Sequence, residues 1–453
     1  MYGPRSRRDF LRLAAGASAA VVVGSSCASG ETGPKRPATA LTRPGRPTLR
    51  IAQFHHFVPA YDAWFDNEYA PRWGERNGVD VIVDHLPQAD LPSRAAAEVA
   101  AGAGHDIFSL LNGAAGLEDH VIDHQTIVEE VQSKVGPVSG EADRATFNPK
   151  TNKRFAFPDY LAAWPVHYRT DLWAGTGLRP DSWDAVLKAA PALRAGGHPL
   201  GISFSGDADG NYGLVGLLAS YGASIQDESG TLALNRPATV EALKMGLAIF
   251  RAGMTDEVLG WDASGSSNNR SLASGRASMI VNAVSALRAI SDQDPALVER
   301  IALLPAPSGP AGPRGCYSAG VYVIWRFSRN HETAKRFLAD LAVGYREAFV
   351  ESGFYNLPAF PGAVPDLALM VSHDDRAKPP DAYALLGETS NWSTNLGQPG
   401  HDNAAIAEVF DRYLVPQMFA AAARGEMTPE EAVKAAEGQM KPIFQKWKDL
   451  GKI

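Results

Sequence analysis

The sequence predicts an α/β protein built around a mostly parallel sheet. Between residues 48 and 111, short apolar segments typical of buried strands alternate with amphipathic segments typical of helices. Of the 453 residues, 45% are hydrophobic and 21% are charged, which is the composition of soluble globular proteins. At about 100–200 residues per domain, this length suggests two or three domains.

The order of the predicted elements runs strand, helix, strand, helix, strand. Thr48–Phe54 is expected to form the first buried strand, and the amphipathic stretch Tyr61–Asn77 the first helix. A second strand is expected at Val79–Val83, an alanine-rich helix at Leu91–Ala103 and a third strand at Asp106–Leu111. Because ligands of open α/β sheets bind beyond the carboxyl ends of the strands, residues that follow these strands are candidates for a binding site.

A second α/β body is expected to begin near Phe157. Ser182 is a plausible cap for a helix that runs through Leu193, and Leu200–Phe204 has the character of a strand. A further helix is expected from Asn235 to Gly253, with apolar residues at helical spacing. Near the end of the chain, Thr428–Glu431 is a capping box with proline at the first helical position.

The first 47 residues are expected to be an export signal followed by a tether. Ser6–Arg12 contains two adjacent arginines followed by Phe-Leu, resembles the twin-arginine motif, and precedes a short apolar stretch. Small residues before Cys27 resemble a lipoprotein processing site, so residues 1–27 are expected to be the signal and Cys27 the lipidation site. The alternative is cleavage nearby, which releases a free secreted or periplasmic protein. Residues 28–47, which consist largely of Gly, Pro, Thr and Arg with almost no bulky apolar residue, are expected to be a flexible tether.

Charge and motifs exclude several classes of function. With 43 Lys and Arg against 50 Asp and Glu, the net charge is −7, which does not suit a nucleic-acid partner. The sequence contains no Gly-x-Ser-x-Gly motif, no His-Glu-x-x-His motif and no phosphate-binding Gly-rich loop, which makes an enzyme a weaker hypothesis. His120 and His124 are four residues apart but lack a third soft ligand, so they are expected on a solvated helix face. We therefore expect neither a metal nor a cofactor. Cys316 is expected to be a small buried residue.

From residue 48 to residue 450 the order of segments resembles a known family. The segments that carry the resemblance are Arg154–Tyr160 with His167–Leu172, Pro180–Asp184, Leu272–Met279, Leu303–Pro307 with Cys316–Gly320, and Ala423–Ala432. This order resembles the extracellular solute-binding proteins of ABC importers, specifically the carbohydrate-binding family (family 1).

The resemblance implies two α/β lobes joined by a hinge, as in periplasmic binding proteins, with the ligand in a cleft between them. The N-terminal lobe would contain residues 48–155 and about 318–348, and the C-terminal lobe residues 156–317 and about 349–453. The protein would capture a sugar or oligosaccharide by hinge closure and deliver it to the membrane permease of its importer. We therefore expect a monomer at the cell surface or in the periplasm, and no enzymatic activity.

Sugars require flat aromatic surfaces for their C–H faces and planar polar groups for their hydroxyls. Residues of these types at positions expected in the cleft are the candidate ligand contacts: His55, His56, Asn112, Asp159, Tyr160, Trp164, Trp261, Asp262, Asn282, Tyr317, Ser318, Tyr355, Asn356 and Trp392. Each has a structural alternative, since the aromatic residues could belong to the core and the histidines could be solvated. The stretch Asp207–Asn211 is expected to be a polar turn or one side of the cleft.

Two other functions remain open from the sequence. A glycerol-3-phosphate or glycerophosphodiester ligand would need basic residues in the cleft, for which Arg270, Arg288 and Arg314 are candidates. A secreted carbohydrate-active enzyme would need two carboxyl groups flanking one bond, and Asp159 with Asp262 is the pair that the sequence offers.

Overall fold

The N-terminal strands belong to a mixed sheet of seven strands, which also contains strands from later parts of the chain. The strand order is β13-β6-β12-β3-β1-β2, with β14 paired to β12. Its strands are β1 (Thr48–Phe54), β2 (Asp80–Leu86), β3 (Ile107–Leu111), β6 (Phe157–Ala163), β12 (Gly315–Ile324), β13 (Leu357–Pro358) and β14 (Ser393–Thr394). The neighbours β1, β2 and β3 are parallel to one another, whereas β12 is antiparallel to both β3 and β6. We call this sheet the first sheet.

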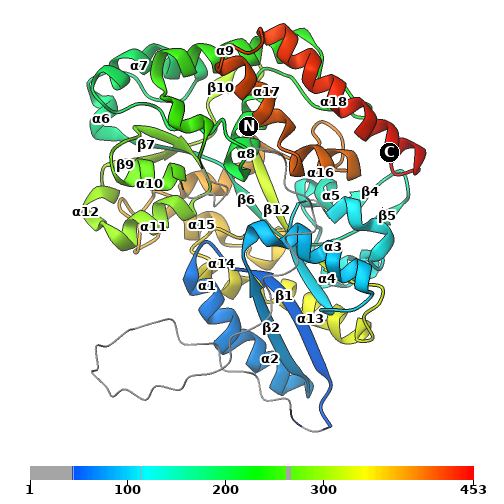
Figure 1. Cartoon of the computed structure of the whole chain (residues 1–453). Coiled ribbons are helices and arrows are strands. Elements are labelled where there is room, and N and C mark those ends of the chain that lie inside the picture. The colour runs from blue at the N-terminus through cyan, green and yellow to red at the C-terminus, as the bar shows by residue number, and fades with distance from the viewer. Residues whose placement is uncertain (1–42, 44, 113, 262–266) are drawn as a thin grey trace, which may run out of the picture. The chain divides into compact units, whose positions relative to one another are not determined.

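A second sheet has three antiparallel strands in the order β8-β7-β9. These are β7 (Val166–Arg169), β8 (Met279–Val281) and β9 (Ile301–Leu304); two small hairpins pair β4 (Phe147–Asn148) with β5 (Lys153–Arg154) and β10 (Ser308–Gly309) with β11 (Gly312–Pro313). Figure 1 shows β6 and β12 running from the region of the second sheet into the first sheet.

The computed structural model describes residues 43, 45–112, 114–261 and 267–453. The twin-arginine motif, Cys27 and Asp262 therefore lie outside the described residues, while residues 42–453 form one unit. Within the described ranges, no helix has both the length and the apolar character needed to cross a bilayer.

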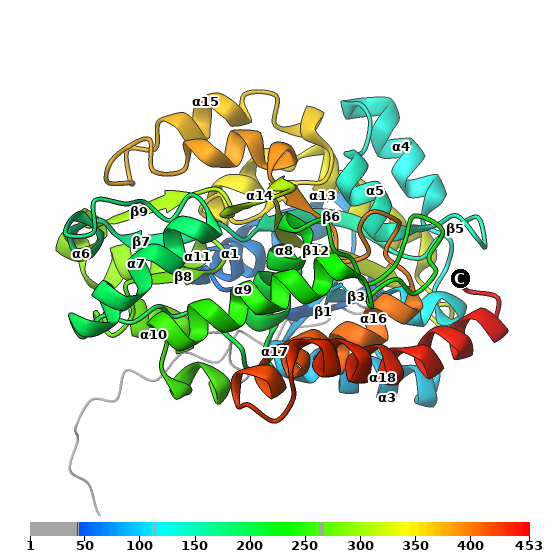
Figure 2. The ribbon, with the colours of Figure 1, turned by 90° about the horizontal axis from the view of Figure 1, so that it is seen from above.

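Helices cover the two sheets on several sides (Figure 2). Their bounds are α1 (Pro59–Trp64), continued by a π-helical turn at Phe65–Tyr69 into α2 (Ala70–Asn77), then α3 (Leu91–Ala101), α4 (Gln125–Val135), α5 (Gly140–Thr146), α6 (Thr170–Ala174), α7 (Trp183–Ala195), α8 (Ala208–Ser220), α9 (Pro237–Gly253), α10 (Ser267–Ala273), α11 (Ser285–Gln293), α12 (Pro295–Val298), α13 (His331–Val343), α14 (Arg346–Glu351), α15 (Leu367–Ser372), α16 (Ala404–Asp411), α17 (Leu414–Ala423) and α18 (Pro429–Asp449). Short 3-10 turns occur at Gln88–Asp90, Ala114–His120, Asp256–Leu259, Pro361–Ala363 and Ala384–Asn391.

Most elements predicted from local patterns are confirmed. The first strand has the predicted bounds, and the Thr428 hydroxyl accepts from the Glu431 backbone while the Glu431 carboxylate accepts from the Thr428 backbone, as a capping box requires. Two expectations were wrong. The first sheet is mixed rather than mostly parallel, because β12 is antiparallel to β3 and β6. Leu200–Phe204 is not a strand, because its amides bond to scattered carbonyls, such as those of Gly253 and Val258, rather than to one ladder. Of the two alternatives for Asp207–Asn211, the polar turn is wrong, because the Asp207 carboxylate caps the start of α8.

His124 is also not solvated, contrary to expectation. It is fully buried at the start of α4, where its Nδ1 lies 3.1 Å from the Arg154 carbonyl and its Nε2 accepts from the Ile324 backbone amide at 3.0 Å. Burial lowers the pKa of this imidazole to about 4, so the ring is held neutral as a structural bridge to β12. His120 is exposed and ends a 3-10 turn.

Candidate ligand-binding site

The carboxyl end of β3 meets the middle of β12 in the first sheet, where Leu111 pairs with Gly320. Asn112 follows β3 with a left-handed backbone (φ 59°), a conformation that Asn adopts more readily than most residues. Its backbone amide donates to the Ala319 carbonyl at 3.0 Å, and its Oδ1 accepts from the Ala319 amide at 3.1 Å. The remaining donor, Nδ2, bonds to the hydroxyl of Tyr212 on α8. Asn112 thus connects the first sheet to α8.

A cavity of about 170 Å³, which we call the main cavity, lies next to this junction. Residues that follow strands of the first sheet form part of its wall, and α8, α11 and the residues after β8 form most of the rest. Its lining residues are Phe57, Gln88, Leu111, Trp164, Ala208, Asp209, Tyr212, Asn269, Asn282, Ala283, Ser285, Ala289, Ser318 and Tyr355. A ligand in this cavity would contact the surroundings of both sheets.

Asp209 is the centre of a polar cluster in the main cavity. Its Oδ1 accepts from Trp164 Nε1 at 3.3 Å, and its Oδ2 accepts from Asn268 Nδ2 at 2.9 Å and Asn282 Nδ2 at 3.2 Å. Asn282 Nδ2 also donates to Asn269 Oδ1 at 2.6 Å. Burial raises the pKa of the Asp209 carboxyl well above its usual range, and the nearby Asp207 charge adds to this effect.

Aromatic rings line the main cavity beside this polar cluster. Trp164 and Tyr212 have ring centroids 4.1 Å apart, and both side chains are almost fully buried. Tyr355 packs its ring against Phe57 at 5.8 Å, and the Ser318 hydroxyl lies beside the phenols of Tyr212 and Tyr355. The site therefore combines flat apolar surfaces with amide and carboxyl groups in one small volume.

An adjoining cavity of about 250 Å³ shares Gln88, Leu111 and Ala208 with the main cavity. It continues between α3 and the residues around Phe410 and Tyr413. Among the described residues that line these two cavities there is neither a lysine nor an arginine. The combined space therefore suits a neutral ligand better than an anionic one.

Five of the residues predicted from the sequence line these cavities: Trp164, Asn282, Ser318 and Tyr355 in the main cavity, and Asn112 in the adjoining one. Three more lie directly behind Tyr355. The rings of His56 and Tyr160 lie 5.1 and 5.9 Å from that of Tyr355, and Asn356 Oδ1 is 3.1 Å from His56 Nε2. These three positions can support the cavity wall without touching a ligand in it.

The structure places the other predicted residues away from the two cavities. Tyr317 is buried and donates its hydroxyl to the Glu141 carbonyl at 2.9 Å, and the Trp392 side chain is buried in the core. Asp159 is buried, which raises the pKa of its carboxyl to about 8, while the Tyr345 hydroxyl opposes this shift. Trp261 is half-buried against the core, and His55 is exposed. Asp262 lies outside the described residues.

The lining residues that the list of sequence candidates omits include Asp209 and Tyr212, which supply the central carboxyl group and one aromatic ring of the main cavity. The sequence offered one indication of them, because Asp207–Asn211 was considered as one side of the cleft. Both residues lie on the same face of α8, three positions apart, and this face packs on β12. Their proximity to Trp164 and Asn282 depends on tertiary packing that the local sequence does not encode.

Comparison with known proteins identifies the family. Residues 59–342 match the family described as bacterial extracellular solute-binding protein. Three proteins named as binding proteins, from Brucella abortus and Brucella suis, are 26% identical to this chain over 274 residues. That alignment covers 58% of this chain and spans 64% of the length of those relatives.

Solved structures share the fold. An oligosaccharide periplasmic-binding protein of Synechococcus sp. MITs9220 in complex with zinc superposes with a TM-score of 0.74 at 19% identity, over 88% of this chain and 99% of that one. A sugar transporter of Arthrobacter chlorophenolicus A6 with laminaribiose gives 0.72 at 16% identity, and a maltose-bound protein of T. maritima gives 0.71 at 17%; each covers 87% of this chain and 99% of the other. The fold is thus the two-lobed one of periplasmic binding proteins, and the chain belongs to the bacterial extracellular solute-binding protein family.

Proposed function

We propose that this protein is the extracytoplasmic binding component of an ABC importer and that it captures a sugar or oligosaccharide in the main and adjoining cavities. The observation that carries the proposal is the lining of the main cavity, where Trp164, Tyr212 and Tyr355 supply aromatic surfaces beside Asp209 and Asn282. Sugar rings present C–H faces to aromatic rings and hydroxyls to planar polar groups. Structural neighbours with bound laminaribiose and maltose support this ligand class.

Capture by hinge closure follows from the distribution of the lining residues. Phe57 and Leu111 come from the first sheet and its loops, whereas Asn282 and Asp209 come from the second sheet and α8. A ligand that touches both groups binds the closed form more tightly and shifts the population toward it. The permease of the importer would then recognise the closed form.

For the lobes we retain the division expected from the sequence, with crossings near residues 155, 317 and 349. The pairing of β12 with β3 supports the assignment of residues after 317 to the N-terminal lobe. The strand β6 also pairs with β12 in the first sheet, although it follows the first crossing. The hinge would accordingly lie within or beside β6 and β12.

Export through the twin-arginine route and lipidation at Cys27 complete the proposal. The family description supports an extracellular location, and the motif at Ser6–Arg12 supports the route. A lipid anchor would hold the folded protein near a membrane permease. Metabolic labelling with a radioactive fatty acid tests this point: the label should appear in the wild-type chain and be absent from Cys27→Ala, and labelling of both would contradict it.

Thermal unfolding of the full chain against mono-, di- and trisaccharides and glycerophosphodiesters tests the ligand class. A ligand at a hundredfold excess over its dissociation constant stabilises the folded state by about 2.7 kcal/mol, so a saccharide should raise the melting temperature. The same samples should show no hydrolysis products, because we infer that the chain is not an enzyme. Asp159, one of the two carboxyl groups that an enzyme would need, lies outside both cavities.

A shift with a glycerophosphodiester instead of a saccharide would contradict the proposed ligand class. The three arginines considered for an anionic ligand lie elsewhere: Arg288 pairs with Asp374 at 2.6 Å, and Arg270 and Arg314 are exposed. None of them lines either cavity. Measurable hydrolysis of a saccharide would equally overturn the assignment as a binding protein.

A further inference from the structure

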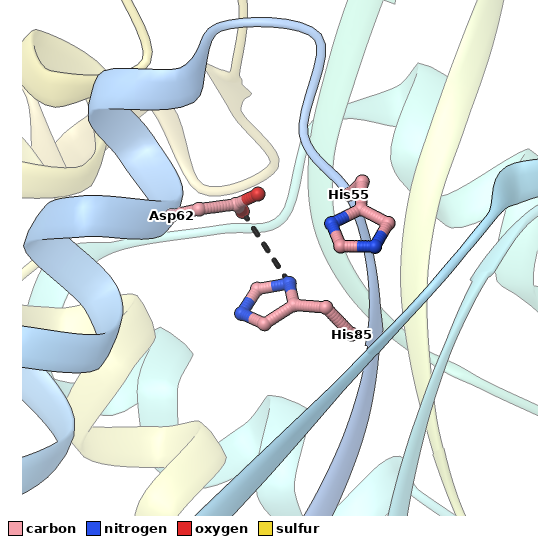
Figure 3. Close-up of side chains that lie close together, drawn as sticks. All are labelled: His55, Asp62 and His85. Atoms are coloured by element: carbon pink, nitrogen blue, oxygen red, sulfur yellow. Dashed lines mark ion pairs between the residues drawn. The ribbon is translucent and has the colours of Figure 1, made fainter. Parts of the chain in front are cut away.

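Three potential metal ligands from separate elements meet at the carboxyl edge of β1 and β2. His55 directly follows β1, Asp62 lies on α1, and His85 is the penultimate residue of β2. One ligand atom from each residue lies within 4.8 Å of those of the other two. Figure 3 shows the three side chains facing one common space, with His85 Nδ1 3.7 Å from Asp62 Oδ1.

The His85 ring is oriented by a fourth residue. Its Nε2 lies 2.9 and 3.0 Å from the two carboxylate oxygens of Asp66. Because a carboxylate accepts a hydrogen bond from a ring N–H, Asp66 favours the tautomer with the proton on Nε2. The lone pair of Nδ1 then lies on the side of Asp62, where the Phe54 carbonyl oxygen is also 3.4 Å from Nδ1. Histidines that bind a metal through one ring nitrogen commonly donate a hydrogen bond from the N–H of the other ring nitrogen to a carboxylate.

The two carboxylate oxygens of Asp62 have different surroundings. Oδ2 accepts from the His56 backbone amide at 3.0 Å. Oδ1 is buried and has no hydrogen-bond partner among the described residues. An unpaired buried carboxylate oxygen is costly, so a ligand that fills the space beside Oδ1 would offset that cost.

The third side chain, His55, is exposed and its ring stacks on that of His85 with centroids 5.5 Å apart. An exposed imidazole can change rotamer at low cost, which allows the three ligand atoms to contract to the spacing that a metal requires. Two imidazole nitrogens, one carboxylate oxygen and an open position for water form the ligand set of a tetrahedral zinc site. The same donors also suit copper, nickel and cobalt.

We propose that His55, Asp62 and His85 bind one divalent transition-metal ion, with Zn²⁺ as the expected ion and Asp66 as the positioning residue for His85. No local pattern in the sequence indicated this site, and the expectation was no metal, because His55 and His85 are 30 positions apart, one directly after β1 and the other within β2. The alternative role for the cluster is an ion pair between a protonated His85 and its two aspartates. Burial disfavours that charge, but the hydrogen bond to Asp66 and the charge of Asp62 raise the pKa of His85.

The proposed metal site lies next to two loops that line the main cavity. His55 is two residues before Phe57, and His85 is three residues before Gln88; both of these residues line the main cavity. A metal that joins His55 to His85 would therefore fix the two loops relative to each other. Metal binding itself does not depend on which solute the protein carries.

Titration calorimetry with ZnCl₂ tests the proposal on the full chain, purified without a polyhistidine tag and first dialysed against a chelator. We expect one Zn²⁺ per chain, and a visible spectrum of tetrahedral Co²⁺ when CoCl₂ replaces ZnCl₂. His55→Ala changes an exposed side chain, so folding should be retained while the affinity falls at least tenfold. Asp66→Asn should weaken binding by about 10- to 100-fold, as expected for a residue that orients a metal ligand.

His373→Ala provides a matched control, because His373 forms an exposed pair with Asp375 at 3.2 Å but belongs to no cluster of three ligands among the described residues. Its Zn²⁺ affinity should equal that of the wild type. Absence of Zn²⁺ binding by the wild type would overturn the proposal and leave the cluster as an ion pair. Binding that is unchanged in both His55→Ala and His85→Ala would overturn it as well.

Discussion

Replacing Asp209 with alanine is expected to weaken saccharide binding about a hundredfold. The carboxyl group accepts hydrogen bonds from Trp164, Asn268 and Asn282, so its removal releases an aromatic ring and two amides that face or adjoin the main cavity. Leaving such buried donors unpaired costs about 1–3 kcal/mol, and a hundredfold loss corresponds to about 2.8 kcal/mol. Calorimetry with the saccharide that raises the melting temperature measures the effect.

Two variants separate binding from stability in this experiment. Asp209→Asn keeps one acceptor oxygen in the same place, so its affinity should stay within tenfold of the wild type. Asp402→Ala removes another buried carboxyl group, which accepts from Asn395 and the Gly397 backbone outside the main and adjoining cavities. It should lower the melting temperature and leave the affinity unchanged. Wild-type affinity in Asp209→Ala would exclude the main cavity as the saccharide site.

Substitution of Gly320 by alanine is expected to destabilise the protein by about 3 kcal/mol or more. Gly320 lies in the middle of β12, where a Cβ atom would be 2.0 Å from Cε1 and 2.2 Å from Cζ of Tyr160. The Tyr160 ring cannot simply move away, because it is buried and packs edge-on against Tyr355. The midpoint of urea unfolding should therefore fall markedly.

The double variant Tyr160→Ala/Gly320→Ala tests the cause of this effect. Removing the ring makes room for the new methyl group, so the double variant should be more stable than the sum of the two single effects indicates. Gly438→Ala is the control, because this exposed helical glycine has no atom within 4 Å of the added Cβ and should become slightly more stable. An unchanged midpoint in Gly320→Ala would contradict the close packing of Tyr160 on β12.

Features that depend on neighbouring residues were predictable from the sequence. The first strand and the α18 capping box follow from local periodicity and from residues three positions apart. Asn112 and Asn282 were named as candidates because each directly follows a strand, and both line the cavities. At these positions the sequence order itself determines the place in the fold.

Features that depend on tertiary packing were not predictable in the same way. Tyr317 and Trp392 have the chemistry of ligand contacts, yet their side chains lie in the core. Asp209 and Tyr212 reach the cavity because α8 packs on β12, an element that begins 95 positions after α8 ends. A single sequence contains no periodic signal for such a contact.

The central position of β12 has a consequence for the synthesis of the protein. Ile324 pairs with Ile107, so the first sheet joins segments more than 200 residues apart in the chain. At a synthesis rate of about 5–20 residues per second, residue 324 is added roughly 16–65 s after the first residue. Until then β3 lacks its partner on one side, and an unpaired strand edge promotes aggregation. The nascent chain is thus most vulnerable to aggregation before β12 has emerged from the ribosome.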